Sequence, residues 1–250
     1  MNEDIELLRS AEEAAVRARY ARRSGDFLET GRYHPVLLDR LISRQQKERV
    51  IADFLRKRWL GRIGQLRVLE IGCESGGTLQ MLFGLGINPA RAIGLDLLEE
   101  HIDRAKRRLP SSCVLLQADG LATELPLAGF DLVVQSTVFS SVLDSRVRHA
   151  LAERMVSLIA PGGVILWYDI SLDNPQNPDV LGISVLELRS LFPGCTIRVR
   201  RLTLAPPIAR MVGRMGYAAS IAFGLIPFLR SHLLAWIEPA GKETTRPGAA

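Results

Sequence analysis

The sequence predicts a doubly wound α/β fold built on a seven-stranded, mostly parallel sheet. Three observations support this fold class. Short apolar segments alternate with helical segments through the middle of the chain, as parallel strands alternate with their crossover helices. A glycine-rich turn follows the first apolar segment, and an acidic residue ends each of the next two. The 250 residues, 47% of them hydrophobic, are enough for one such domain with an added segment.

Two helical segments precede the first predicted strand. Residues 5–23 are densely charged and have a weak, alanine-rich apolar face, so we expect a helix that is peripheral or packs across a partner chain in a homodimer. Pro35 opens a second helix over residues 36–59, whose apolar residues recur at helical spacing beside a basic exposed face. Residues 1–62 are therefore interpreted as an N-terminal helical extension, and the sequence leaves open whether its two helices cap the active site or pair with a partner chain.

Residues 63–240 are interpreted as the main domain. Seven segments have strand patterns: 66–71, 91–96, 112–119, 130–136, 163–170, 195–204 and 231–238. Helical patterns cover 97–109, 146–160, 184–191 and 206–230. The apolar stretch 206–230, just before the last strand, is predicted to be a helical lid, and the polar tail 241–250 is predicted to be disordered.

Composition and charge exclude several classes of protein. The three cysteines have no metal-ligand spacing, so we expect no metal site and no disulfide framework. The N-terminus lacks the apolar core of a signal peptide, and the longest apolar run is too short to span a bilayer, so we expect a cytoplasmic protein. Residues 1–67 and 198–250 carry net charges of +5 and +6, and residues 68–197 carry −6. Basic ends of this kind attract anionic partners or form solvated faces.

Functional residues gather where the predicted strands end. The first strand runs into residues 70–77, EIGCESGG, where glycines allow a sharp turn and the close approach of a ligand. The second strand ends at Asp96, which can accept hydrogen bonds from both hydroxyls of a ribose. The third ends at Asp119, which can accept from an adenine amino group. Carboxyl ends of parallel strands are where open α/β sheets bind ligands.

The ordered set of motifs resembles the class I S-adenosylmethionine (SAM)-dependent methyltransferases, in particular their type 11 and type 25 domains. VLEIGCESG is similar to the first motif of this family, IGLD to the second and QADG to the third. FDLVVQS is similar to the fourth strand, and LIAPGGVIL to the signature that follows it. The resemblance covers residues 66–170 and implies a Rossmann-like fold, methyl transfer and SAM as the cofactor.

The resemblance also implies roles for individual residues. Glu70 would orient the amino-acid end of the cofactor, and Gln135 would lie near its methyl group. Asp96 would bind the ribose and Asp119 the adenine amino group. The remaining expected cofactor contacts are Gly72, Gly76, Leu97 and Gly120. Glu74 departs from the family pattern, which usually has glycine there. A glutamate is accommodated at this position if its side chain points outward and its φ is negative; otherwise the local geometry differs and affinity for the cofactor suffers.

The acceptor is expected above the ends of the fourth and fifth strands. Methyl transfer from a sulfonium depends mainly on positioning and desolvation, and an oxygen acceptor also benefits from a general base. Tyr168, Asp169 and His232 are the candidate catalytic residues. Asn174 and Asn177, in a loop rich in Asn, Asp and Pro, are the candidate substrate-binding residues, because such a loop offers many hydrogen-bonding groups.

Residues 165–238 also resemble, more loosely, the methyltransferases of bacterial surface-polysaccharide gene clusters. The resemblance rests on WYD followed by NPQNPDVLGIS, on LAPPIAR and on PFLRSHLLAWI. It implies that the acceptor is a sugar hydroxyl or a lipid-linked glycan. The apolar segment 206–230 would then be a lid, or would rest on the inner face of a membrane.

Three functions remain open from the sequence. The first is methylation of a small-molecule or glycan hydroxyl, and the second is methylation of a lipid quinone or another apolar acceptor. The third is a non-catalytic binding module, which the unusual Glu74 keeps open. Nucleic-acid methylation is not favoured, because QSTVF stands where an Asn/Asp-Pro-Pro-aromatic motif is expected. A nicotinamide oxidoreductase would need a Gly-x-Gly-x-x-Gly turn, which is absent.

Overall fold

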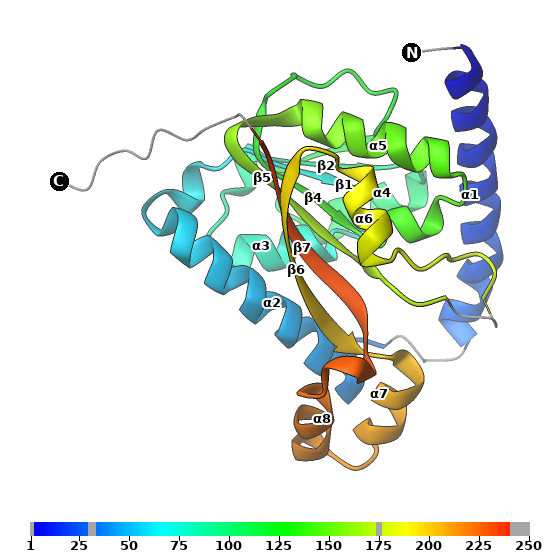
Figure 1. Ribbon diagram of the computed structural model, residues 1–250, viewed down its shortest axis with the longest axis vertical. Helices are drawn as coiled ribbons and strands as arrows, with labels where there is room; N and C mark the ends of the chain where they lie inside the picture. The colour runs from blue at the N-terminus through cyan, green and yellow to red at the C-terminus, as the bar shows by residue number, and fades with distance from the viewer. Residues whose placement is uncertain (1–2, 30–33, 174–176, 241–250) are drawn as a thin grey trace.

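Seven strands form one sheet in the order β3-β2-β1-β4-β5-β7-β6 (Figure 1). The computed structural model describes residues 3–29, 34–173 and 177–240. All strands are parallel except β7, which runs antiparallel to both of its neighbours. The strands are β1 Val68–Ile71, β2 Ala92–Asp96, β3 Val114–Gln117, β4 Phe130–Ser136, β5 Ile159–Ile170, β6 Cys195–Leu204 and β7 Arg230–Pro239. The predicted doubly wound, mostly parallel sheet is confirmed.

Helices cover both faces of this sheet. They are α1 Glu3–Glu29, α2 Leu38–Trp59, α3 Gly77–Gly84, α4 Glu99–Arg108, α5 Ser145–Leu158, α6 Val185–Leu191, α7 Pro206–Gly213 and α8 Tyr217–Gly224. Short 3-10 turns occupy Leu60–Gln65, Pro89–Arg91, Phe139–Ser141 and Pro227–Leu229. None of the helices in the described ranges is long and apolar enough to cross a membrane.

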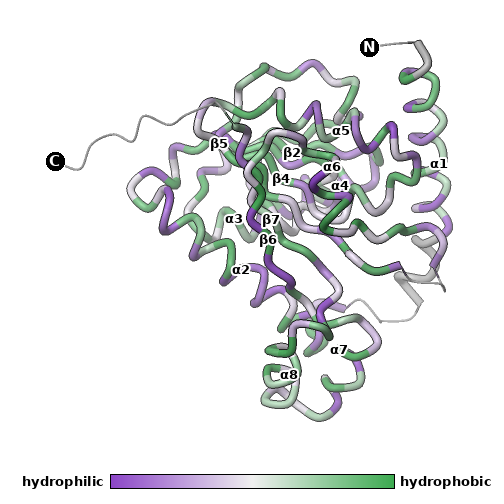
Figure 2. Tube along the Cα trace, in the orientation of Figure 1, coloured by the Kyte–Doolittle hydropathy of each residue, from purple (hydrophilic) through white to green (hydrophobic). Residues whose placement is uncertain are grey.

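Two hydrophobic clusters fill the space between the sheet and the helices. On one face, apolar side chains of α2, α3 and α4 pack against alternate residues of the strands, such as Val68 and Leu166. On the other face, α5 and α6 pack against the intervening strand residues, such as Leu69 and Trp167, which point the opposite way. Because the central strands are buried on both faces, they are almost continuously hydrophobic, as the green strands of Figure 2 show.

The order of the strands reverses between β1 and β4. From β1 the chain moves outward to β2 and β3, and then returns to place β4 on the opposite side of β1. The crossover helices therefore diverge at the carboxyl ends of β1 and β4, which leaves a crevice there. This crevice contains the glycine-rich turn after β1, and α1 and α2 both lie against it.

Two element boundaries differ from the prediction. The helix expected over residues 146–160 ends at Leu158, because β5 begins at Ile159 and continues across a register shift opposite Phe130 and Leu132. The helical stretch expected over residues 206–230 is interrupted, since Gly216 has a φ of 103° between α7 and α8. Pro227 then opens a separate 3-10 turn.

Candidate active site

The turn after β1 places glycine where a side chain has no room. Gly72 has a φ of 69°, and a Cβ atom there would clash with Val138. Gly76 has a φ of 79° and caps α3, and its position is crowded by Leu109. Gly72 lines both cavities described below, whereas Gly76 lines neither. Gly76 therefore shapes the turn from within.

Glu74 has a conformation that the sequence did not lead us to expect. Its side chain is exposed, but its φ is +49° rather than negative. The reason lies in the hydrogen bond that the turn requires, because the Glu74 N–H donates to Oδ2 of Asp96 at 2.8 Å. The left-handed backbone is ordinary for glycine but strained for glutamate.

Asp96 connects the turn to the end of β2. Its Oδ1 atom accepts a hydrogen bond from the Leu98 N–H at 3.0 Å and lies 3.0 Å from Nδ1 of His101. The carboxylate is 8% exposed, and it lines a cavity together with Leu97. Local hydrogen bonds thus fix the orientation that a ribose-binding carboxylate needs.

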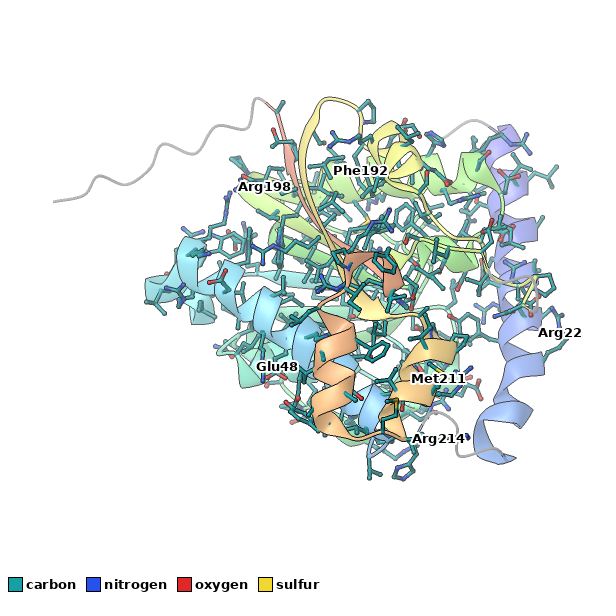
Figure 3. All side chains as sticks on the ribbon, turned by 60° about the horizontal axis from the view of Figure 1, so that its bottom comes forward. Arg22, Glu48, Phe192, Arg198, Met211 and Arg214 are labelled. Carbon is teal, nitrogen blue, oxygen red and sulfur yellow. The ribbon has the colours of Figure 1, made fainter. Side chains whose placement is uncertain are left out.

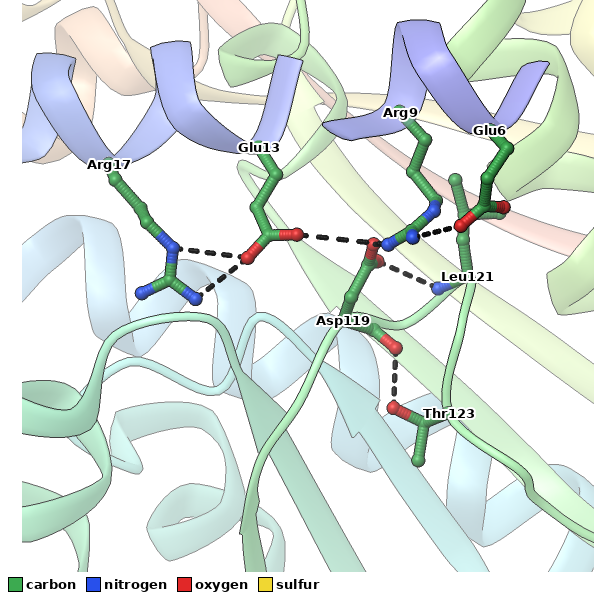
Figure 4. Close-up of polar contacts among 7 residues, drawn as sticks. All are labelled: Glu6, Arg9, Glu13, Arg17, Asp119, Leu121 and Thr123. Carbon is green, nitrogen blue, oxygen red and sulfur yellow. Dashed lines mark hydrogen bonds and ion pairs between the residues drawn. The ribbon is translucent and has the colours of Figure 1, made fainter. Parts of the chain in front are cut away.

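Asp119 is held by two partners, of which one comes from the N-terminal helix. Its Oδ1 accepts from the Leu121 N–H at 2.9 Å, and its Oδ2 accepts from Nη1 of Arg9 at 2.5 Å (Figure 4). Arg9 also pairs with Glu6, and its hydrogen bonds to Glu6 and Asp119 raise its pKa. A further ion pair joins Arg9 to Glu13 at 3.7 Å.

The first cavity lies between α1 and the carboxyl ends of β1, β2 and β3. Its volume is about 120 Å³, and its lining includes Gly72, Asp96, Leu97, Asp119 and Gly120. These five were all expected to bind the cofactor. On the opposite wall, α1 contributes Arg9, Glu12, Glu13, Val16 and Tyr20. This coverage by α1 could not be read from the sequence.

The second cavity lies under α2 and is larger, at about 640 Å³. It shares Gly72 and Glu74 with the first cavity, so the two adjoin at the glycine-rich turn. The strand ends contribute Glu70, Ser136 and Tyr168. The helix α2 contributes Arg40, Ser43, Arg44, Lys47 and Glu48.

Glu70 and Lys47 face each other across this second cavity. Burial raises the pKa of Glu70 to about 8, against the opposing effect of Lys47. Burial likewise lowers the pKa of Lys47, against the opposing effect of Glu70. Oε2 of Glu70 is buried and has no hydrogen-bond partner among the described residues. Such an oxygen suits an ammonium group, as the amino-acid end of SAM carries.

Tyr168 and His232 lie together on the α2 side of the sheet. Their rings are stacked with centroids 5.2 Å apart, and the Tyr168 hydroxyl is 2.7 Å from Oγ1 of Thr203. Burial raises the pKa of Tyr168, so its hydroxyl stays protonated at neutral pH. Burial, followed by the charges of Lys47 and Arg40, lowers the pKa of His232 to about 4. Tyr168 lines the second cavity, and His232 lies behind it.

Asp169 lies on the opposite face of β5 from Tyr168. It is fully buried, and its carboxylate accepts hydrogen bonds from the N–H groups of Ser140 at 3.2 Å and Ile170 at 2.9 Å. Burial raises its pKa to about 6. This opposite face separates Asp169 from Tyr168 and His232, the other two candidate catalytic residues, which stack on each other. Successive side chains of a strand point to opposite faces, which accounts for the separation.

Gln135 and Asn177 line neither cavity. Gln135 is fully buried, with Oε1 accepting from the Val138 N–H at 3.0 Å and Nε2 donating to the Tyr168 carbonyl at 3.4 Å. Asn177 accepts from the Asp179 N–H at 3.3 Å within its own loop. Asn174 lies outside the described residues. Gln135 therefore supports the site from beneath.

Arg9 and Lys47 are the residues that sequence reasoning missed. Arg9 lies 110 positions from Asp119, and no local pattern links the two. For Lys47 a signal was present, since Arg40, Arg44 and Lys47 recur at helical spacing on the basic face of the second helix. We had interpreted that face as exposed, whereas all three residues line the second cavity.

Comparison with known proteins identifies a methyltransferase domain in this chain. Residues 68–163 match a family described as a methyltransferase domain. No curated protein matches the chain significantly. A SAM-dependent methyltransferase from Mesorhizobium loti is 19% identical, with a TM-score of 0.53 over 74% of this chain and 96% of the other.

Two further solved structures are similar over a larger share of this chain. DhpI, solved as a complex with S-adenosylhomocysteine (SAH), is 21% identical and has a TM-score of 0.57 over 92% of this chain and 97% of its own. The [4+2]-cyclase SpnF is 14% identical and has a TM-score of 0.54 over 78% of this chain and 81% of its own. At these identities the likeness concerns the fold.

The fold and the domain match together define the class of protein. Residues 68–163 match a methyltransferase domain and lie in a Rossmann-like fold, which together indicate a SAM-dependent methyltransferase with SAM as its cofactor. The residues present fit that cofactor. Gly72 leaves room for a close approach, Glu70 has an unpartnered buried oxygen, and Asp96 and Asp119 line one cavity.

Proposed function

We propose that this protein transfers the methyl group of SAM to a hydroxyl group of a small molecule or glycan. The observation that carries this proposal is the pair of cavities that meet at Gly72 and Glu74. The first contains the acids suited to adenosine, Asp96 and Asp119. The second, with about 640 Å³, is within the roughly 300–1,000 Å³ typical of ligand sites, so it can take the methionine end and an acceptor together.

The polar groups of the second cavity suit an oxygen nucleophile. SAM supplies an activated methyl group when bound, so the protein has mainly to align the acceptor and exclude water. The protonated Tyr168 hydroxyl can donate a hydrogen bond to the acceptor and orient it. His232 does not line this cavity, so we propose that its neutral ring, stacked on that of Tyr168, positions the phenol, while the proton of the acceptor leaves to solvent.

Methyl transfer from isotopically labelled SAM tests this proposal. We expect labelled ethers when the protein is incubated with a panel of sugars and glycolipids. His232→Gln should lower kcat, because Tyr168 loses the ring that it stacks against. His149→Gln, on the exposed side of α5, is the matched control and should leave kcat unchanged. Label recovered only in amines or quinols, at wild-type rates in His232→Gln, would contradict the proposal.

The end of the molecule formed by α7 and α8 supports a peripheral membrane contact, with a lipid-linked or apolar acceptor as the alternative substrate. Phe228 is 81% exposed and Leu225 70%, and Met215, in the turn between α7 and α8, is also exposed. Figure 3 shows Met211 and Arg214 at this outer end. Apolar side chains next to basic ones favour the surface of an anionic membrane.

Sedimentation with vesicles tests this contact. Wild-type protein should sediment with vesicles of anionic phospholipid and much less with vesicles of phosphatidylcholine alone. The double variant Leu225→Ser/Phe228→Ser should lose most of the binding, because each change removes an apolar anchor. Leu186→Ser, at an 81% exposed position on α6, is the matched control. Equal sedimentation of the double variant and the wild type would refute the contact.

A further inference from the structure

Three basic residues follow one face of α2. Arg40, Arg44 and Lys47 are separated by four and three positions, so they are neighbours on the helix surface. All three line the second cavity, opposite Ser136 and Tyr168. Like charges this close repel one another, and an anion bound between them would reduce this electrostatic repulsion.

The acidic residues of the cavity are unevenly distributed along this face. Glu70 and Glu74 act on Lys47, at one end of the basic row. Arg40 has Asp39 at 3.7 Å, on its own helix. Within the described parts of the chain, Arg44 forms no ion pair or hydrogen bond, and its side chain is exposed to the cavity. Glu48, one helical turn from Arg44, also lines the cavity but forms no ion pair with it in the described parts of the chain, so the charge of Arg44 is not paired.

The positive charge extends from α2 to the bottom of the cavity. Arg40 and Lys47 both lower the pKa of His232, and Arg40 also acts on Tyr168. Nζ of Lys47 lies 4.9 Å from the centre of the Tyr168 ring. An anion held by α2 would thus lie on the same side as the two candidate catalytic residues.

We propose that Arg40 and Arg44 bind an anionic group of the methyl acceptor, either a phosphate or a carboxylate. The inference rests on the proposed function and adds the chemical class of its substrate. SAM brings only one carboxylate into the cavity, and Lys47, next to Glu70, is the cation placed for it. Two guanidinium groups one helical turn apart remain, and guanidinium is the group best suited to bidentate binding of such anions.

Calorimetric titration of inorganic phosphate and of acetate into SAH-saturated protein tests the proposal. Ionic strength is held constant, because exposed charges are screened by salt. We expect one anion to bind to the wild type and to bind at least tenfold more weakly to Arg40→Gln/Arg44→Gln. The matched control is Arg49→Gln, on the same helix but outside both cavity linings, and it should bind as the wild type does. The better-bound anion identifies the group.

The affinity for SAH separates this inference from the proposed function. The double variant should bind SAH within about twofold of the wild type, since Lys47 is intact. If SAH instead displaces phosphate and acetate, the arginines serve the cofactor and the inference is wrong. Equal anion binding by the wild type and the double variant would also overturn it. If SAH does not bind the wild type, the proposed function fails, and the same titration of unloaded protein still decides whether α2 holds an anion.

Discussion

Glu74 carries backbone strain at the centre of the candidate site. Its φ of +49° is the left-handed conformation, which costs a non-glycine residue about 1–2 kcal/mol. The strain persists because the Glu74 N–H orients Asp96. The sequence identified the position as unusual but not its conformation, since the φ of one residue depends on a hydrogen bond to another strand.

Glu74→Gly should therefore stabilise the protein. Relief of about 1–2 kcal/mol of strain exceeds the roughly 0.5–1 kcal/mol that glycine costs through the unfolded chain. We expect a net gain of about 0.5–1 kcal/mol in urea unfolding, by the same comparison. Ser75→Gly is the control and should destabilise, because residue 75 has no positive φ to relieve. A loss of stability in Glu74→Gly would show that its side chain contributes more than the strain costs.

Asp169 should make stability depend on pH. Its pKa is raised from 3.8 to about 6 in the folded protein, so between these values the folded state holds a proton that the unfolded state has released. Stability therefore falls as pH rises through this window, by about 3 kcal/mol at about 1.4 kcal/mol per unit.

Unfolding in urea at several pH values measures this effect. The free energy of unfolding of the wild type, relative to that of Asp169→Asn, should decrease between about pH 4 and pH 6 and then level off. Asp103→Asn, on the exposed surface of α4, is the control and should run parallel to the wild type. Parallel curves for the wild type and Asp169→Asn would mean that the carboxylate is ionised throughout.

At the scale of elements, patterns within a segment predicted the structure better than contacts between segments. Both ends of the strand 195–204 were predicted correctly, because the alternation of apolar and polar residues within the segment indicates a strand. The stretch 206–230 was predicted as a single helical lid, although Gly216 and Pro227 divide it. The position of α1 over the first cavity was not predicted, because α1 is attached through charged residues far apart in sequence.

Polar contacts fix α1 to the rest of the protein. Besides the pair of Arg9 with Asp119, Glu12 accepts from the Leu143 N–H at 2.8 Å, and Arg19 donates to the Ser141 carbonyl at 2.8 Å. The cavity beneath α1 holds about 120 Å³, less than the roughly 300 Å³ of a small ligand site. We therefore expect the helix to shift when adenosine binds.

Arg9→Ala should make the first cavity easier to reach. The change frees the Asp119 carboxylate. In the wild type, the adenine amino group would have to replace the Arg9 guanidinium group as a hydrogen-bond donor to it. In stopped-flow fluorescence we expect association of SAM to be about three- to tenfold faster, which corresponds to roughly 1 kcal/mol. Arg17→Ala, which breaks only a pair with Glu13, is the control and should leave the rate unchanged. Slower association in Arg9→Ala would mean that Arg9 helps to bind SAM rather than obstructing it.

At the scale of the whole molecule, the sequence predicted the framework of the site but not its coverings. Glu70, Gly72, Asp96 and Asp119 lie at the ends of strands or just after them. Parallel strands bring their carboxyl ends to one edge of a sheet whatever the details of packing. The covering helices α1 and α2 have no such rule, because their placement depends on long-range contacts. The proposed acceptor site lies largely under α2, so its candidate residues depend on long-range contacts that the sequence does not specify.

Calorimetric titration of SAM into the wild type, Asp96→Ala and Asp103→Ala tests the central claim most directly. We predict micromolar affinity for the wild type, about −8 kcal/mol, and the same for Asp103→Ala. Asp96→Ala should bind at least 100-fold more weakly while remaining folded by circular dichroism, because the ribose loses its hydrogen-bond acceptor. Absence of SAM and SAH binding to the wild type, or equal affinity in folded Asp96→Ala, would contradict the account of a SAM site at the ends of β1 and β2.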